Sequence, residues 1–309
     1  MLAHRRVRWV PWNLVVLAAL LLTSCTPAAP TGQSSATAAK SVGARDCSPL
    51  PLKPHDFPTS PKVDNRFYPL VPGMQFFLDG AAVAEDGTSH PHRIATVVTD
   101  LTKVVDGVRS LVLFEQDIEG NEVLESEVFF VAQRKDGSVW TLGEYPEEYE
   151  KGKLTGAPST WISGTAGARA GIAMLAHPRV GTPTYLQGLG PDIGFKDCAT
   201  VFRTGQRACR TLRCYDDVLV VDEFAPLEPE GGHQRKFYAP GVGAVQVAAA
   251  GAGVDPEALK LSRAAKLCAQ EFANVRQQAL AQEDRGYRVA KDVYGATTRA
   301  EQTLDAETC

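Results

Sequence analysis

The chain has 309 residues, of which 44% are apolar and 22% are charged. This composition is typical of a globular protein with a sizeable core, and it excludes a disordered chain, a collagen-like repeat and a polytopic membrane protein. There are 32 basic and 36 acidic residues, which gives a formal charge of -4. Because nucleic-acid-binding proteins are usually basic, we expect no nucleic-acid partner.

The N-terminus has the pattern of an export signal. Residues 1–13 contain three arginines and no acidic residue, and an unbroken apolar run follows at residues 14–22. As a helix this run would be about 14 Å long, roughly half of the ~30 Å hydrocarbon core, so it fits a signal peptide better than a membrane span. It ends in Leu22-Thr23-Ser24-Cys25, which resembles the lipobox of bacterial lipoproteins.

The lipobox resemblance implies that residues 1–24 are a signal peptide, removed by cleavage before Cys25. It further implies that Cys25 is diacylated on its sulfur and acylated on its new amine. Several acyl chains hold a protein stably at a bilayer, whereas a single chain holds it marginally. We therefore expect a lipid anchor in the cell membrane, on the extracytoplasmic face. The alternatives are an ordinary cleaved signal with a coincidental cysteine and an uncleaved single-span anchor.

The remaining chain divides by composition. Residues 25–63 are rich in Ala, Ser, Thr and Pro and predict a flexible tether followed by a Pro-rich lead-in. Residues 64–295 carry regular aromatic and aliphatic residues and predict a single β-rich domain. Residues 296–309 predict a polar tail that frays.

Three tight-turn dipeptides predict long antiparallel strands between residues 92 and 143. Asp106-Gly107, Gly120-Asn121 and Asp136-Gly137 each lie between runs of β-branched or aromatic residues. Asp-Gly is a strong hairpin signal because two-residue turns require positive φ angles. Parallel pairing would need crossover helices that this stretch cannot hold. Further strands are expected at residues 199–207, 217–224, 234–238 and 244–248.

A helix is predicted at residues 269–283, where apolar residues recur at helical spacing. Residues 257–266 are ambiguous, because they form either a last strand or the start of that helix, with Pro256 at its first position. The predicted fold is mainly β: a curved antiparallel meander sheet or a partly open barrel, with the C-terminal helix packed on it.

Six of the seven cysteines remain if Cys25 is lipidated, and an even number in an exported chain suggests disulfides. The candidates are Cys198, Cys209 and Cys214, and a bond between the last two would close a hairpin-sized loop and contribute about 2 kcal/mol on the chain-entropy model. Free buried thiols and a zinc site are the alternatives, but no Cys-x-x-Cys pair exists. The pairing of three others stays open: Cys47, Cys268 and Cys309.

No catalytic signature stands out. The sequence contains no Walker A motif, dinucleotide fingerprint or Gly-x-Ser-x-Gly elbow, so we expect no cofactor and lean against an enzyme. His90 and His92 resemble a chelating pair, but their Gly/Ser/Thr surroundings predict a solvated loop and no metal. The acidic residues at 144–150 could supply oxygens to Ca²⁺ or paired carboxylates to a glycosidase, but a solvated loop is the simpler interpretation.

Three stretches resemble an uncharacterised family of exported bacterial lipoproteins, mostly from high-GC actinobacteria. They are residues 64–73 (DNRFYPLVPG), residues 142–150 (LGEYPEEYE), and residues 226–229 (PLEP) followed by residues 236–243 (KFYAPGVG). The resemblance spans about residues 64–295. It implies an exported β-rich domain, and it carries over no reaction, cofactor or catalytic residue.

These observations favour a membrane-anchored envelope protein that binds a hydrophobic or envelope-derived ligand without turning it over. Because curved sheets can enclose apolar ligands, we expect the ligand between the sheet and the helix. Two alternatives remain. One is a scaffold whose sheet edge meets another envelope protein. The other is a hydrolase of cell-wall material that uses carboxylates at residues 144–150.

Replacing Cys25 tests the anchor. We expect Cys25→Ala to move the protein from the membrane fraction to the soluble fraction, because no thiol remains to be acylated. Detergent phase partitioning of the two proteins measures the change, and Ser24→Ala, which keeps both a small residue and the thiol, is the matched control. Unchanged partitioning of Cys25→Ala would contradict a lipid anchor.

Overall fold

The computed structural model describes residues 47–83, 88–210, 212–229, 232–250 and 258–309. The predicted signal peptide, Cys25 and most of the tether lie outside the described residues. None of the helices within these ranges has the length and apolarity that a membrane crossing requires.

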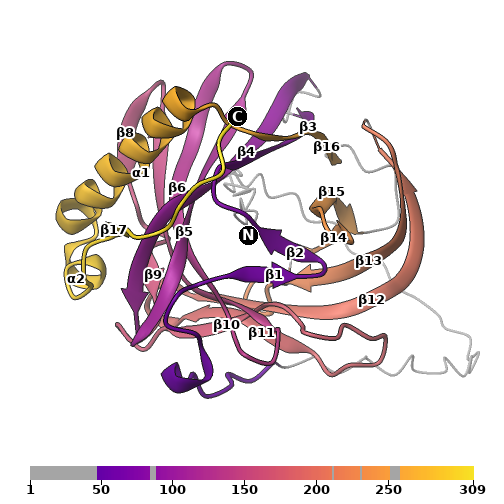
Figure 1. Cartoon of the computed structure of the whole chain (residues 1–309), viewed down its shortest axis with the longest axis horizontal. Coiled ribbons are helices and arrows are strands. Elements are labelled where there is room, and N and C mark those ends of the chain that lie inside the picture. Colours follow the sequence, from indigo (N-terminus) through magenta and orange to yellow (C-terminus); the bar gives the residue numbers. More distant parts are fainter. Residues whose placement is uncertain (1–46, 84–87, 211, 230–231, 251–257) are drawn as a thin grey trace, which may run out of the picture.

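Twelve antiparallel strands close into a barrel (Figure 1). The predicted fold class, mainly antiparallel β with a C-terminal helix, is confirmed, and the barrel is closed rather than partly open. Consecutive barrel strands pair with each other, and the last strand returns to pair with the first. The strands are β3 (Met74–Val83), β4 (Ser89–Val105), β5 (Val108–Glu119), β6 (Glu122–Gln133), β7 (Val139–Glu150), β10 (Arg169–Met174), β11 (Tyr185–Gly190), β12 (Phe195–Cys209), β13 (Cys214–Phe224), β14 (His233–Ala239), β15 (Gly243–Ala250) and β16 (Leu259–Lys266).

The barrel closes where β7 meets β10. The first half of β7 pairs with β10, as in Thr141 with Gly171, and its second half pairs with two short strands, β9 (Trp161–Ile162) and β8 (Lys153–Gly156). A Cβ atom at Gly171 would lie 2.3 Å from the backbone carbonyl carbon of Gln187 on β11. The closing strand therefore requires glycine at this position, because no side chain fits between the two backbones.

The turns and the C-terminal elements follow the sequence patterns. Asp106 and Gly107 have φ angles of 49° and 76°, and Gly137 also has a positive φ. Residues 257–266 contain β16, so the strand alternative is correct for this stretch. The predicted helix is α1 (Ala269–Val289), which is followed by α2 (Lys291–Tyr294).

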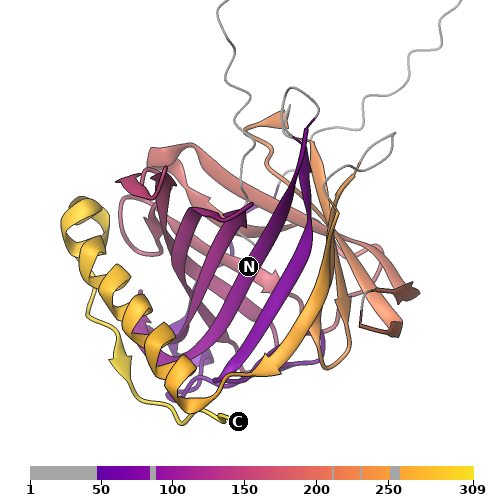
Figure 2. The same ribbon diagram turned by 90° about the horizontal axis from the view of Figure 1, so that it is seen from above.

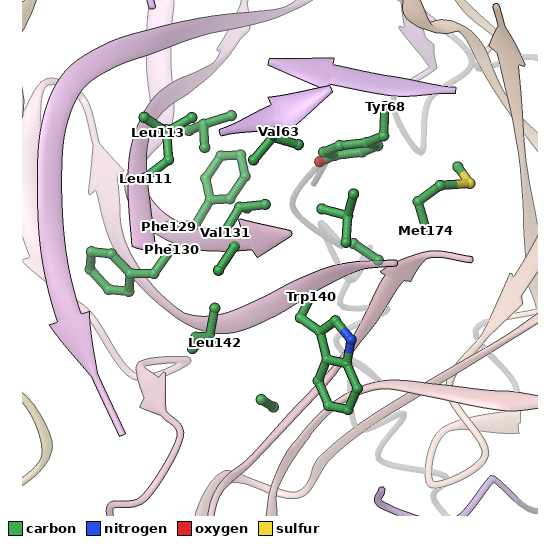
Figure 3. Packing of buried hydrophobic residues seen from close by; sticks show 14 of the residues in the cluster. Val63, Tyr68, Leu111, Leu113, Phe129, Phe130, Val131, Trp140, Leu142 and Met174 are labelled. Atoms are coloured by element: carbon green, nitrogen blue, oxygen red, sulfur yellow. The ribbon is translucent and has the colours of Figure 1, made fainter. Parts of the chain in front are cut away.

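A short hairpin lies inside the ring of strands (Figure 1). It consists of β1 (Val63–Asn65) and β2 (Tyr68–Leu70), and it follows a 3-10 helix, η1 (Pro54–Asp56). Figure 3 shows Leu113, Phe129 and Val131 on the side of the wall that faces this hairpin, with Phe130 on the other side. The hairpin and the inner wall share one hydrophobic core, which contains Val63 and Tyr68.

Polar contacts fix the hairpin at one end of the barrel. The Asn65 side chain donates hydrogen bonds to the carbonyl oxygens of Gly137 (2.9 Å) and Leu175 (3.1 Å), and the amide of Gly241 donates to the carbonyl oxygen of Arg66 (2.7 Å). These partners belong to the β6–β7, β10–β11 and β14–β15 connections, and we call this the hairpin end. The far end contains the β5–β6 turn and the 3-10 helix η2 (Pro191–Ile193).

The C-terminal helix α1 lies on the outer surface of the barrel, against β4 and β6 (Figure 2). The space between them is filled, because Phe272, Ala279 and Gln282 of α1 are buried. The expectation of a ligand between sheet and helix is therefore wrong. Ion pairs fasten the helix to the wall: Arg276–Asp100 (2.6 Å), Lys103–Glu283 (2.9 Å) and Arg285–Glu147 (2.6 Å).

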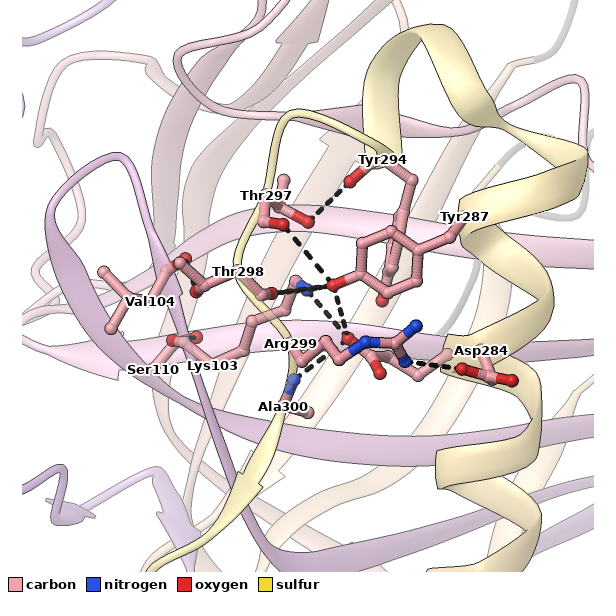
Figure 4. Close-up of polar contacts among 11 residues, drawn as sticks. Lys103, Val104, Ser110, Asp284, Tyr287, Tyr294, Thr297, Thr298, Arg299 and Ala300 are labelled. Carbon is pink, nitrogen blue, oxygen red and sulfur yellow. Dashed lines mark hydrogen bonds and ion pairs between the residues drawn. The ribbon is translucent and has the colours of Figure 1, made fainter.

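Lys103 is the most deeply buried of these cations, with no exposed side-chain surface. Its Nζ donates hydrogen bonds to Glu283, to the Tyr287 hydroxyl (3.0 Å) and to the Thr298 carbonyl oxygen (Figure 4). The ring of Tyr294 lies 4.5 Å from the ammonium nitrogen. Burial lowers the pKa of Lys103, and the Glu283 carboxylate opposes that shift.

The polar C-terminal segment follows the barrel wall instead of fraying. Its strand β17 (Glu301–Gln302) pairs with β4, and the chain ends in a disulfide between Cys309 and Cys268. Sequence polarity alone predicted a free tail. The hydrogen bond from Gln302 to Asp100 (2.9 Å) gives this polar segment its partner on the wall.

The expectation of disulfides is confirmed, and the described chain contains three. On the chain-entropy model the Cys47–Cys198 bond stabilises the fold by about 5 kcal/mol, the Cys209–Cys214 bond by about 2 kcal/mol and the Cys268–Cys309 bond by about 4 kcal/mol. Such bonds are typical of oxidising, extracytoplasmic compartments.

The buried pair under α1 predicts a non-additive effect on stability. We expect Lys103→Met to lower the free energy of unfolding by about 3–5 kcal/mol, because it leaves the Glu283 carboxylate buried without its cation. Adding Glu283→Gln should restore much of this loss, because the uncompensated charge is then gone. Urea unfolding with the disulfides intact measures both values. Equal losses in the single and double variants would contradict this account.

Candidate functional site

The strand register gathers carboxylates on one face of β5, β6 and β7. Glu115 pairs with Glu127, and Asp117 pairs with Glu125, which in turn pairs with Glu148. Paired residues of antiparallel strands share a face, and so do residues two apart along one strand. These acids therefore lie together, and Glu144 on β7 belongs to the same face. We call them the acidic wall: Glu115, Asp117, Glu125, Glu127, Glu144 and Glu148.

The acidic wall faces the lumen. Glu115 lines a cavity of about 70 Å³ together with Tyr68 of the internal hairpin. On the same strand face, Leu113 and Leu111 follow toward the hairpin end, where the wall becomes apolar (Figure 3). The inner surface of β5 and β6 is thus apolar at the hairpin end and acidic toward the far end.

The cavity is mostly apolar and lies beside the hairpin. Its wall includes Phe76, Leu78, Leu113, Tyr68 and Tyr238, with Glu115 as its charged member. The hydroxyl of Thr96 donates a hydrogen bond to Glu115. Burial raises the pKa of Tyr68 far above its ordinary value, and nearby carboxylates, Glu115 first, add to that shift. Tyr68 therefore stays a neutral phenol at any pH the protein meets.

Glu127 is the most unusual member of the acidic wall. Its side chain is almost fully buried, with 2% of the residue exposed, and neither carboxylate oxygen has a hydrogen-bond partner. Burial raises the pKa of Glu127 well above its ordinary value, and Glu144 and Glu115 add to the shift. Burial also raises the pKa of Glu125 to about 8, with Asp117 as the next cause. Both shifts reflect the cost of holding negative charge on this buried face without a compensating cation.

Several other charges in the lumen have partners from the protein. Lys236 on β14 pairs with Glu223 on β13 at 2.7 Å, and both side chains are buried. The Gln187 amide also donates to Glu223 (3.0 Å). On β4, His92 lies 2.9 Å from Asp117. The chain thus supplies cations or donors to several buried acids, and Glu127 contrasts with them.

The structure corrects two expectations about chemistry. His90 and His92 lie in strand β4 rather than in a solvated loop, and Nε2 of His92 contacts Asp117. Residues 144–150 belong to strand β7 rather than to a loop. No cluster of three or more His, Cys, Asp or Glu side chains within the described ranges is arranged to hold a metal ion.

Because successive side chains of β7 point to opposite faces, the two carboxylates suggested for hydrolysis lie on different sides of the sheet. Glu148 belongs to the lumen face, whereas Glu147 faces α1, where Arg285 binds it through two nitrogens. The hydroxyls of Tyr145 (2.8 Å) and Tyr149 (2.7 Å) also donate to Glu147. Glu147 and Glu148 therefore do not form a catalytic pair, and Glu147 fastens the helix.

Sequence reasoning missed the acidic wall. Its signal was present, because Glu115 and Asp117 on β5, and Glu125 and Glu127 on β6, occupy alternate positions next to apolar runs. Such acids normally mark the solvated face of a sheet. Only closure of the barrel turns that face inward. The disulfide candidates Cys198, Cys209 and Cys214 do not line the cavity.

Comparison with known proteins gives a distant structural similarity. The chain matches no protein-family model, and no curated protein is significantly similar to it. A solved structure from Bacteroides fragilis, described provisionally as an exported protein with a YmcC-like fold, aligns with a TM-score of 0.35 and 12% identity. The alignment covers 65% of this chain and 100% of that chain. No family model assigns the chain to the lipoprotein family that its sequence resembles.

The raised pKa values predict that stability falls as pH rises. The pKa of Glu125 is 4.5 in its ordinary state and about 8 in the fold, so the neutral acid stabilises the protein below 4.5 and this contribution is lost toward about 8. Glu127 acts in the same direction. We expect Glu127→Gln to be more stable than wild type at neutral pH and to flatten this decline, by about 1.4 kcal/mol for each unit of pKa shift removed.

Chemical denaturation across this pH window measures the effect. Glu122→Gln, an exposed position on the same strand, is the matched control and should leave the curve unchanged. A Glu127→Gln protein that is less stable than wild type at neutral pH would show that the carboxylate is ionised and compensated.

Proposed function

We propose that the protein is an exported lipoprotein, anchored through acylated Cys25 to the extracytoplasmic face of the cell membrane, that binds a hydrophobic or envelope-derived ligand without turning it over. The single observation that carries the ligand-binding proposal is the apolar cavity in the lumen, closed on one side by the internal hairpin. Barrels too large to be filled by their own side chains enclose ligand cavities in this way.

The dimensions of the cavity indicate how a ligand would sit. About 70 Å³ of space accommodates one end of an apolar chain rather than a whole lipid. Aromatic and aliphatic side chains, among them Phe76, Leu78 and Tyr238, surround this space. Burial of such a chain end is favourable by about 0.8 kcal/mol per methylene group. The rest of the ligand would extend along the lumen toward the far end.

The three disulfides support the export part of the proposal. The tether would join the lipid on Cys25 to Cys47, which the disulfide to Cys198 fixes on the barrel. A flexible chain of this length, residues 26–46, spans roughly 25 Å on average. The barrel would therefore remain close to the membrane from which an envelope ligand would come.

The two alternatives receive less support. A scaffold that uses a sheet edge would need a long unpaired edge, whereas the twelve barrel strands are paired on both sides and the edge strands β8 and β17 have 4 and 2 residues. A hydrolase using residues 144–150 would need converging carboxylates, and Glu147 and Glu148 lie on opposite faces of β7.

Filling the cavity tests the proposed function. Ala244 lines the cavity, and Ala244→Leu places three further carbons in it. We expect native mass spectrometry of protein purified from its host membranes to find a bound small molecule in wild type, and at least about tenfold less in this variant. Ala296→Leu, at an exposed site after α2, is the matched control and should retain the ligand. Equal retention in Ala244→Leu, or no ligand in any protein, would overturn the proposal.

A further inference from the structure

We infer that the ligand is an amphipathic amine, whose apolar end occupies the cavity and whose ammonium group binds the acidic wall at Glu127 and Glu115. This inference rests on the proposed function, because it assumes that the lumen holds a ligand. It adds the chemical class of the polar end.

The buried Glu127 side chain points to a missing cation. A carboxylate removed from water costs several kcal/mol unless a cation or hydrogen-bond donors compensate it. Neither oxygen of Glu127 has such a partner among the described residues, although the residue is only 2% exposed. A structural acid would be paired, as Glu223 is with Lys236. An unpaired carboxylate that is buried this deeply suits a cationic partner that comes from outside the chain.

Glu127 lies next to the cavity. Its register partner is Glu115, which lines the cavity, and directly paired residues have Cβ atoms about 4.5–5.5 Å apart. An ammonium group between the two carboxylates can donate up to about three hydrogen bonds, enough to reach both. A chain seated among Leu78, Leu113 and Phe76 would place its polar end at this position.

The rest of the acidic wall extends the site toward the far end. Residues two apart on a strand are separated by about 7 Å, so Asp117 and Glu125 form the next carboxylate pair beyond Glu115 and Glu127. This ladder suits an amine, or a short row of amines, attached to an apolar chain. It would repel a fatty acid or a phospholipid with net negative charge.

The test compares ligands that share a chain and differ in charge. The full lipoprotein is held in nanodiscs of neutral phosphatidylcholine, and empty nanodiscs give the partition baseline. The probes are octylamine, octanol, octanoate and the free polyamine spermine. Calorimetric titration measures the affinity of each. We expect octylamine to bind at least about tenfold more tightly than octanol, and octanoate more weakly than octanol.

Two variants test the amine site and the apolar cavity separately. Glu127→Gln should reduce octylamine binding to the level of octanol and leave octanol unchanged, whereas Ala244→Leu should weaken both. Glu122→Gln, exposed on the same strand, should change neither. Spermine binding that Glu127→Gln abolishes would support the amine site and identify free polyamines, rather than amine lipids, as the source.

The results distinguish a failure of the amine inference from a failure of the proposed function. If octanol and octylamine bind equally and Ala244→Leu weakens both, the amine inference is overturned and the proposed function stands. If octylamine binds more tightly than octanol by the same factor in wild type and in Glu127→Gln, the amine site at Glu127 is overturned as well. If neither alkyl probe binds above the nanodisc baseline, the proposed function itself fails.

Discussion

The pairing of β7 with β10 is the constraint on which the rest of the structure depends. A meander of long strands alone would present one face to a core and one to solvent. Because Thr141 pairs with Gly171, the sheet meets itself, and one face becomes the lining of a lumen. This closure brings Glu115 and Glu127 inside, and it leaves the opposite face of the same strands to pack under α1.

A lumen must be filled or used, and the two ends of this barrel differ in that respect. At the hairpin end, β1 and β2 bring Val63 and Tyr68 into the same core as the inner wall. Toward the far end the wall carries acids in place of apolar side chains. Burial of Glu127 without a partner opposes folding, and such a departure from otherwise consistent packing is characteristic of functional sites.

The elements were easier to predict from the sequence than their closure. Turn dipeptides such as Asp106-Gly107 specify local backbone geometry, so the strands and their antiparallel order follow from short segments. Closure joins residues that lie far apart in the sequence, and it depends on Gly171, where glycine is required by the approach of β11 and not by any local signature. The acidic wall was missed for the same reason. Alternating acids at 115–117 and 125–127 predict a solvated face until the sheet is known to close.

Buried acids with a structural role in this fold are paired with cations or hydrogen-bond donors from the chain itself. On the outer face, Glu147 receives Arg285 and two tyrosine hydroxyls. Glu283 receives the ammonium group of Lys103. On the inner face, one strand away, Glu127 receives nothing from the described residues. Since the fold pairs buried acids with its own cations on both faces, as Glu283 with Lys103 and Glu223 with Lys236, the missing cation at Glu127 supports the proposal that a ligand supplies it.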